Sequence, residues 1–132
     1  MKIQPDRSEH ICITSYGSNW IAVNGKPYPH HLLVSAIGTV KPWLGHDLFN
    51  DIAEHSNTVL QTECEIVLIG CGKKQFFLPP HTLISFIHCG VGVETMDTAA
   101  ACRTFNVLAS EGRKVTAILL IEVADSPTLT LS

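Results

Sequence analysis

The strongest chemical candidates in this sequence are glycines and polar side chains near two predicted strand ends. Gly70-Cys71-Gly72 follows an apolar run, and glycines in that place let backbone N–H groups approach a phosphate. A dinucleotide-binding loop needs a third glycine, but Gln75 stands where it would lie. Lys73 and Lys74 could attract a phosphate or form a solvated loop. The pattern therefore favours a structural turn, with a small anionic ligand as the alternative.

A second group of polar residues lies between positions 94 and 106. Asp97 and Thr98 precede a helical pattern, where their side chains can accept hydrogen bonds from first-turn N–H groups. Arg103 lies among alanines next to Cys102, so we expect a carboxylate of Glu94 or Asp97 to hold it. A structural tie and a ligand pocket are both open interpretations of this group. The candidate pocket or structural polar cluster comprises Gly70, Gly72, Glu94, Asp97, Arg103 and Asn106.

Cysteine and histidine patterns give little evidence for catalysis or metal binding. The five cysteines form no Cys-x-x-Cys pair, which disfavours a zinc knuckle or a redox dithiol. Cys71 could be an exposed thiol, but no histidine that would activate it can be identified, so a small packing residue is the favoured interpretation. The seven histidines include His30-His31, and none has the spacing typical of a zinc site. We therefore predict no catalytic residue, no metal and no cofactor, and we expect purified protein to carry neither a stoichiometric metal nor a nucleotide.

The spacing of apolar residues predicts which elements position these side chains, and it changes from a strand pattern to a helical pattern along the chain. Asn24-Gly25 predicts a tight hairpin turn within a β meander. The β-type runs are 11–15, 20–23, 32–35 and 39–40. Helical spacing follows at 47–55, from Pro79 to Gly90 and from Asp97 to Gly112, alternating with apolar strands at 65–69, 91–93 and 114–123. We predict an α/β protein in three layers, a β meander plus an α/β/α arrangement with a central mixed five-stranded sheet.

Length and hydropathy predict one domain and no membrane span. With 132 residues, we place a single α/β domain at 1–123 and a flexible C-terminal tail, rich in serine, threonine and proline, at 124–132. The longest apolar stretch, Val115–Ile121, is too short to cross a membrane. The N-terminus is polar and lacks the apolar core of an export signal, so we expect a cytoplasmic protein.

Composition points to a protein partner. Charged residues make up 16% of the chain, below the roughly 25% usual for soluble domains, and the mean hydropathy is +0.22. A homo-oligomer or another protein is expected to cover exposed apolar surface, for which Trp20, Trp43 and Phe49 are candidates. Burial in the core is the alternative for each of the three. The net charge of −3 gives no basis for nucleic-acid binding.

One long segment resembles a known family. The stretch VGVETMDTAAACRTFNVL at 91–108, followed by EGRKV at 111–115, resembles the signature of domain-of-unknown-function family 498. Tyr16-Gly17, Trp43 and Ile69-Gly70-Cys71-Gly72 support the resemblance, whereas the family typically has tyrosine at Phe105 and threonine at Cys71. The resemblance implies a three-layer fold with a central mixed sheet. It also implies kinship with mitochondrial assembly factors for respiratory complex I, which work with a second assembly factor and early peripheral-arm subunits.

These observations lead to two hypotheses of function. The first is a non-enzymatic assembly or interaction factor, related to respiratory complex I biogenesis and bound to complex subunits or to a second copy. The alternative is an enzyme or sensor that binds a small anionic ligand at the Gly70–Gly72 loop near Arg103.

Overall fold

The computed structural model describes residues 10–43, 48–73 and 78–122. For residues 48–50 it describes the backbone only. Asp47 at the start of the predicted helix 47–55, residues Lys74 and Gln75, and the predicted tail 124–132 lie outside the described residues. The first elements in chain order are β1 (Ile13–Tyr16), β2 (Ile21–Val23), β3 (Lys26–Tyr28), β4 (Leu32–Ser35) and β5 (Val40–Pro42). The remaining elements are α2 (Leu48–Glu54), α3 (Ser56–Leu60), β6 (Ile66–Gly70), η1 (Pro80–Leu83), α4 (Ile84–His88), β7 (Gly92–Met96), α5 (Thr98–Ser110) and β8 (Val115–Leu119).

The strands form two sheets. A three-stranded antiparallel sheet has the order β1-β2-β3, and a five-stranded sheet has the order β5-β4-β8-β6-β7. In the larger sheet β6 is parallel to both β7 and β8, whereas β4 is antiparallel to β5 and β8. The predicted central mixed five-stranded sheet is therefore confirmed. Only the first part of the predicted meander forms a separate sheet, because β4 and β5 join the larger one.

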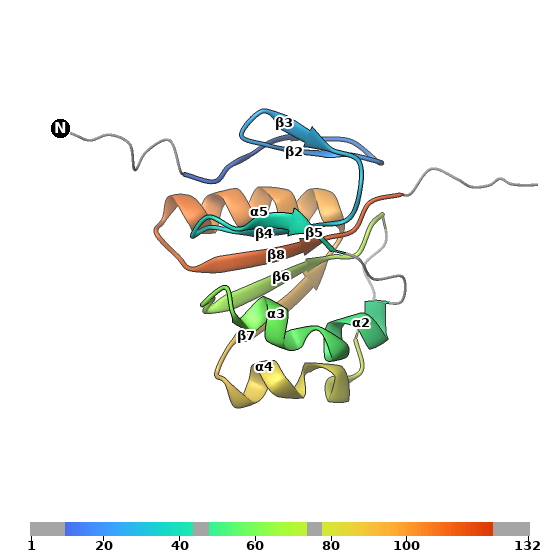
Figure 1. Cartoon of the computed structure of the whole chain (residues 1–132), viewed down its shortest axis with the longest axis vertical. Helices are drawn as coiled ribbons and strands as arrows, with labels where there is room; N and C mark the ends of the chain where they lie inside the picture. Colours follow the sequence, from blue (N-terminus) through green and yellow to red (C-terminus); the bar gives the residue numbers. More distant parts are fainter. Residues whose placement is uncertain (1–9, 44–47, 74–77, 123–132) are drawn as a thin grey trace, which may run out of the picture.

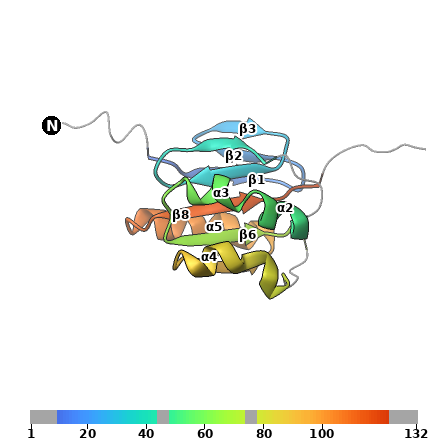
Figure 2. The same cartoon turned by 60° about the horizontal axis from the view of Figure 1, so that its bottom comes forward.

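The fold has three layers, with the five-stranded sheet in the middle (Figure 1). Helix α5 and the three-stranded sheet cover one face, and the short helices α2, α3 and α4 cover the other (Figures 1 and 2). The two faces of β4 separate the two cores, since Leu32 and Val34 pack toward α5 and Leu33 packs toward the short helices. Among the described residues, no helix is long and apolar enough to cross a membrane.

Local signals in the sequence account for several element boundaries. Asn24 and Gly25 both have positive φ angles, 50° and 85°, as the predicted turn between β2 and β3 requires. Pro27 lies in β3 and Pro42 in β5, and both are edge strands, where a missing N–H group is tolerated. Gly112 follows α5 with a φ of 80°, consistent with the predicted helix end.

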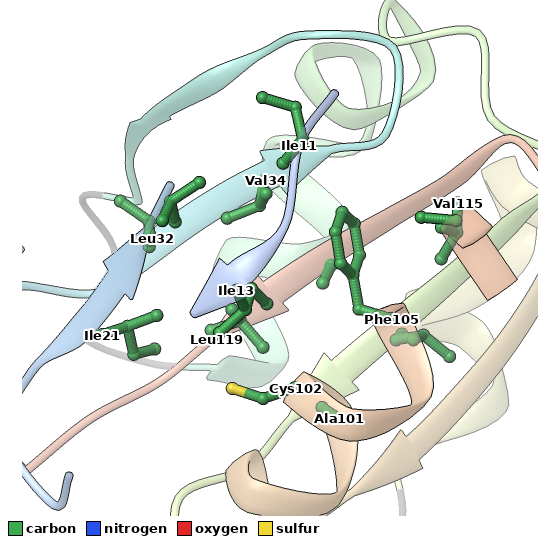
Figure 3. Close-up of a cluster of buried hydrophobic side chains, with 14 of the residues drawn as sticks. Ile11, Ile13, Ile21, Leu32, Val34, Ala101, Cys102, Phe105, Val115 and Leu119 are labelled. Atoms are coloured by element: carbon green, nitrogen blue, oxygen red, sulfur yellow. The ribbon is translucent and has the colours of Figure 1, made fainter. Parts of the chain in front are cut away.

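The core beneath α5 is built from residues far apart in the chain. Phe105, Cys102 and Ala101 of α5 are fully buried against Ile13 of β1 and Leu119 of β8, among others (Figure 3). Because β1 contributes to this core, the three-stranded sheet and the central sheet share one apolar interior.

The expected exposed aromatic surface is only partly supported. Trp43 is 5% exposed and packs in the core formed with α2, α3 and α4, so the alternative of core burial holds for it and it is not a contact residue. Its backbone N–H group donates to the carbonyl of His31, which holds the chain against the sheet just beyond β5. Trp20 is half-buried, and the side chain of Phe49 lies outside the described part. The large apolar residues that are exposed include Ile84 and Ile87 of α4.

Candidate functional site

The start of helix α5 joins three strand ends. Asp97, at the end of β7, accepts a hydrogen bond at Oδ1 from the Ala100 N–H group at 2.7 Å, as predicted for a helix cap. The buried Thr98 has a different role from the predicted one. Its hydroxyl donates to the carbonyl of Leu120 at 2.6 Å and accepts from the N–H group of Gly72 at 2.8 Å. One side chain therefore ties the ends of β6 and β8 to the beginning of α5.

Two N–H groups of the Gly70-Cys71-Gly72 loop donate hydrogen bonds to other residues of the protein. The Cys71 N–H group donates to the carbonyl of Met96 at 2.8 Å, and the Gly72 N–H group donates to Thr98. Gly70 is required by close approach, because a Cβ atom there would lie 2.9 Å from the Thr98 Cα atom. Gly72 has a φ of 87°, which favours glycine. This geometry supports the structural-turn interpretation, since neither N–H group is directed to a phosphate.

A cavity of about 350 Å³ opens beside this loop. It lies at the carboxyl ends of β6 and β8, and the segment that joins β1 to β2 forms another part of its wall. Lys73 and Glu122 form an ion pair in the wall, with 2.9 Å between Nζ and Oε2. The lining residues are Tyr16, Gly17, Ser18, Gly72, Lys73, Asp97, Thr98, Ala99, Leu120 and Glu122.

The cavity contains only part of the candidate set. Gly72 and Asp97 line it, and Gly70 lies just behind it against Thr98. Glu94 is exposed on β7, and Asn106 is engaged with β1, so neither lines the cavity. Sequence reasoning missed the roles of Ser18, Leu120 and Glu122, which reach the cavity from other segments and carried no local signal.

The expected pairing of Arg103 with Glu94 or Asp97 was wrong. Arg103 is exposed, and its Nη1 donates to the hydroxyl of Tyr16 at 3.1 Å. No ion pair of the described residues includes Arg103. Because its position on α5 turns the side chain toward solvent and β1, no acid is needed to compensate a buried charge. Arg103 also does not line the cavity, so the hypothesis of an anion held between the loop and Arg103 gains no support.

Asn106 binds the backbone of β1. Its Oδ1 accepts from the Ile13 N–H group at 2.9 Å, and its Nδ2 donates to the Ile13 carbonyl at 2.8 Å. The amide side chain thus pairs with one residue of β1 much as a neighbouring strand would. Asn106 is a structural tie between α5 and the three-stranded sheet.

The buried cysteines have environments that disfavour a reactive thiol. Cys71 is buried in the core, as expected for a small packing residue and not for an exposed thiol, and its Sγ lies 3.7 Å from the Ile69 carbonyl oxygen. Burial raises the pKa of Cys102 to about 12, although the nearby charge of Arg103 acts in the opposite direction. Since the thiolate is the nucleophile, Cys102 is unreactive near neutral pH.

We expect alkylation to distinguish these thiols. With iodoacetamide at pH 8, exposed Cys12 and Cys89 should be modified in the folded protein, while Cys71 and Cys102 should react only after unfolding. Peptide mass spectrometry with and without urea measures the difference. Rapid native modification of Cys102 would contradict the buried, protonated state.

A second cavity lies on the opposite side of the central sheet from α5. It has a volume of about 300 Å³ and is lined by Trp43, His55 and neighbouring residues. Nearby, possible ligand atoms of Asp51, Glu54 and His55 lie within 4.8 Å of one another. Because Glu54 and His55 are exposed, this group is also typical of a solvated surface, and we assign no metal to it.

The layers and the α5 junction define an α/β domain of the type described as Mth938-like. A solution structure of a Bordetella pertussis protein, described with that term, shares 28% sequence identity and a TM-score of 0.72, covering 93% of this chain and 92% of that one. The chain belongs to the family described as "Protein of unknown function (DUF498/DUF598)", whose model matches residues 13–120.

Two relatives with different names show how far the similarity extends. The bovine NADH dehydrogenase [ubiquinone] 1 alpha subcomplex assembly factor 3 is 37% identical over 113 residues, which cover 82% of this chain and 59% of the relative. This chain therefore matches less than two thirds of the bovine protein's length. A Francisella tularensis protein named 13 kDa major membrane protein is 37% identical over 115 residues, which cover 83% of this chain and 90% of the relative.

Proposed function

We propose that this protein is a non-enzymatic assembly or interaction factor for the biogenesis of respiratory complex I. The observation that carries the proposal is the 37% identity to a complex I assembly factor across 82% of the chain. The partners are complex I subunits, most directly those of the early peripheral arm, together with a second assembly factor. The protein acts in the cytoplasm, where it holds such a subunit before its incorporation.

The α5 junction supports a binding role over a catalytic one. The loop N–H groups of Cys71 and Gly72 donate to the protein itself, and Thr98 is engaged on both sides of its hydroxyl. An enzyme of acyl or phosphoryl transfer needs free donors aimed at the developing charge. The Cys71-Gly72 segment and Thr98 instead hold the ends of β6, β7 and β8 together.

Exposed apolar side chains on α4 offer a surface for a partner. Ile84 and Ile87 are 47% and 61% exposed and lie three residues apart in the helix, on neighbouring turns. Exposed apolar neighbours of this kind are favourable contacts at protein interfaces. They also give the proposal a surface that can be disrupted without entering the core.

We expect the tagged protein to capture complex I subunits when it is purified from a host that makes complex I. Replacing both Ile84 and Ile87 with aspartate should reduce capture at least severalfold, because two charges would have to be buried in the interface. Quantitative mass spectrometry of the captured proteins measures the effect, and Val107→Asp, at a similarly exposed position on α5, is the matched control.

Two results of the capture experiment would contradict parts of this proposal. A monomer by light scattering that captures no complex I subunit above background, at both low and moderate salt, would contradict the assembly role. Equal losses with the α4 double variant and Val107→Asp would remove α4 from the interface while leaving the assembly role in place.

A further inference from the structure

The larger cavity lies where the topology of the sheet changes direction. From β6 the chain passes through α4 to β7 on one side, and from β7 it returns through α5 to β8 on the other side of β6. The two crossovers cover opposite faces of the sheet (Figure 1). Open α/β sheets bind ligands at such switch points, outside the carboxyl ends of the strands. The cavity of about 350 Å³ is at that place and has the size of a ligand pocket.

The charges in the cavity wall are predominantly negative. Asp97 and Glu122 contribute two carboxylates, and Lys73 contributes one ammonium group that already pairs with Glu122 at 2.9 Å. Asp97 uses Oδ1 to cap α5, and no described group donates to its Oδ2. The positive end of the α5 dipole offsets only part of this charge. The guanidinium of Arg103 is bonded to the Tyr16 hydroxyl and does not line the cavity.

Apolar groups lie beside these carboxylates. Leu120, Ala99 and the ring of Tyr16 are part of the wall, and Tyr16 is 37% exposed. A combination of apolar wall and carboxylates matches a long basic side chain, whose methylene groups pack on apolar surface while the cationic head meets an acid. An anion would instead meet the two carboxylates.

Building on the proposed assembly function, we propose that this cavity receives a lysine or arginine side chain of the protein partner. The stem of that side chain packs between Leu120 and Ala99. Its head pairs with Asp97 and takes the place of Lys73 at Glu122, since the Lys73 side chain is 73% exposed and can turn into solvent. The contact fixes the register of a partner that binds elsewhere through apolar surface, because a charged anchor adds specificity to an interface.

Small probes test the cavity separately from the partner. N-acetyl-argininamide and N-acetyl-lysinamide are titrated into the 15N-labelled full chain, with N-acetyl-norleucinamide as the uncharged analogue of lysine. We expect saturable shifts of the Gly72, Ala99 and Glu122 amide signals with the two cationic probes only. The variant Asp97→Asn with Glu122→Gln should weaken binding about tenfold, because it removes both acids.

The variants keep the result interpretable. Asparagine caps helices as well as aspartate does, so Asp97→Asn should preserve α5, and a thermal melt checks that the double variant is folded. Glu94→Gln is the control. It removes one negative charge from β7, outside the cavity, and should leave probe binding unchanged.

Several results would overturn the proposal. The first is an equal shift with the norleucine probe. The second is that acetate or phosphate shifts the same amide signals whereas the cationic probes do not. The third is that no probe gives a saturable shift. Failure of the probes together with capture of complex I subunits would reject the basic anchor and leave the assembly role standing. Probe binding without capture of any subunit would reject the assembly role instead.

Discussion

Replacing Asn106 with alanine is expected to lower the free energy of unfolding by about 2–4 kcal/mol. The side chain makes two hydrogen bonds to the Ile13 backbone, 93 positions earlier in the chain, at 2.9 and 2.8 Å. Its removal takes the hydrogen-bond partner from the Ile13 N–H group and leaves the Ile13 carbonyl only the weak contact of the Cys12 thiol at 3.8 Å; a part-buried group that loses its partner costs about 1–3 kcal/mol. The effect should be confined to stability, since Asn106 lies outside the cavity.

Urea denaturation followed by circular dichroism measures this loss. The matched control is Arg103→Ala on the same helix, which removes a single exposed hydrogen bond to Tyr16 and should cost less than about 1 kcal/mol. Asn106→Asp keeps the acceptor but sets a carboxylate oxygen against the Ile13 carbonyl oxygen, so a loss at least as large as that of Asn106→Ala is expected. A change below about 0.5 kcal/mol for Asn106→Ala would mean that solvent or a rearranged strand replaces both bonds.

Replacing Gly70 with alanine is expected to cost about 1–3 kcal/mol. The new Cβ would lie 2.9 Å from the Thr98 Cα atom and 3.2 Å from the Ala101 Cβ atom, so α5 would have to move away from β6. The contact is with backbone, which cannot rotate aside as a flexible side chain can. Such a shift would also strain the hydrogen bonds of Thr98 to Gly72 and Leu120.

The neighbouring parallel strand provides the control for this change. A Cβ at Gly92 of β7 would find its nearest neighbour at 4.0 Å, which is ordinary contact, and its backbone has no positive φ. Gly92→Ala should therefore be neutral or slightly stabilising, because alanine loses less conformational entropy on folding. Equal losses for both variants in a denaturant titration would show that close approach to α5 is not the cause.

The features predicted correctly are those with a local physical cause. The Asn24-Gly25 turn needs only two residues that tolerate positive φ, and the Asp97 cap needs only an acceptor next to free N–H groups. The alternation of helical and apolar segments predicted the central mixed sheet. The prediction did not include α3, a helix of five residues that follows α2 after a single residue, because so short a segment has no clear period.

The site was harder to predict because its contacts join distant segments. Arg103 meets Tyr16, 87 positions away, and no spacing rule on α5 points to that partner. Trp43 was expected at the surface because it falls outside the predicted elements, but α2 and α3 cover it in the tertiary structure. The cavity depends on the loop from β1 to β2 meeting the end of β8, which only the topology of the whole sheet decides.

The strand order also has a consequence for synthesis of the protein on the ribosome. Strand β8 is the last strand of the described residues but lies at the centre of the sheet, between β4 and β6. Until residues 115–119 leave the exit tunnel, β4 can pair only with β5, and β6 only with β7. The apolar side chains of Leu32, Val34 and Leu68 then lack their central neighbour. Nascent chains therefore expose these half-sheets to chaperones until residues 115–119 have emerged, and the central sheet is complete only when β8 is inserted.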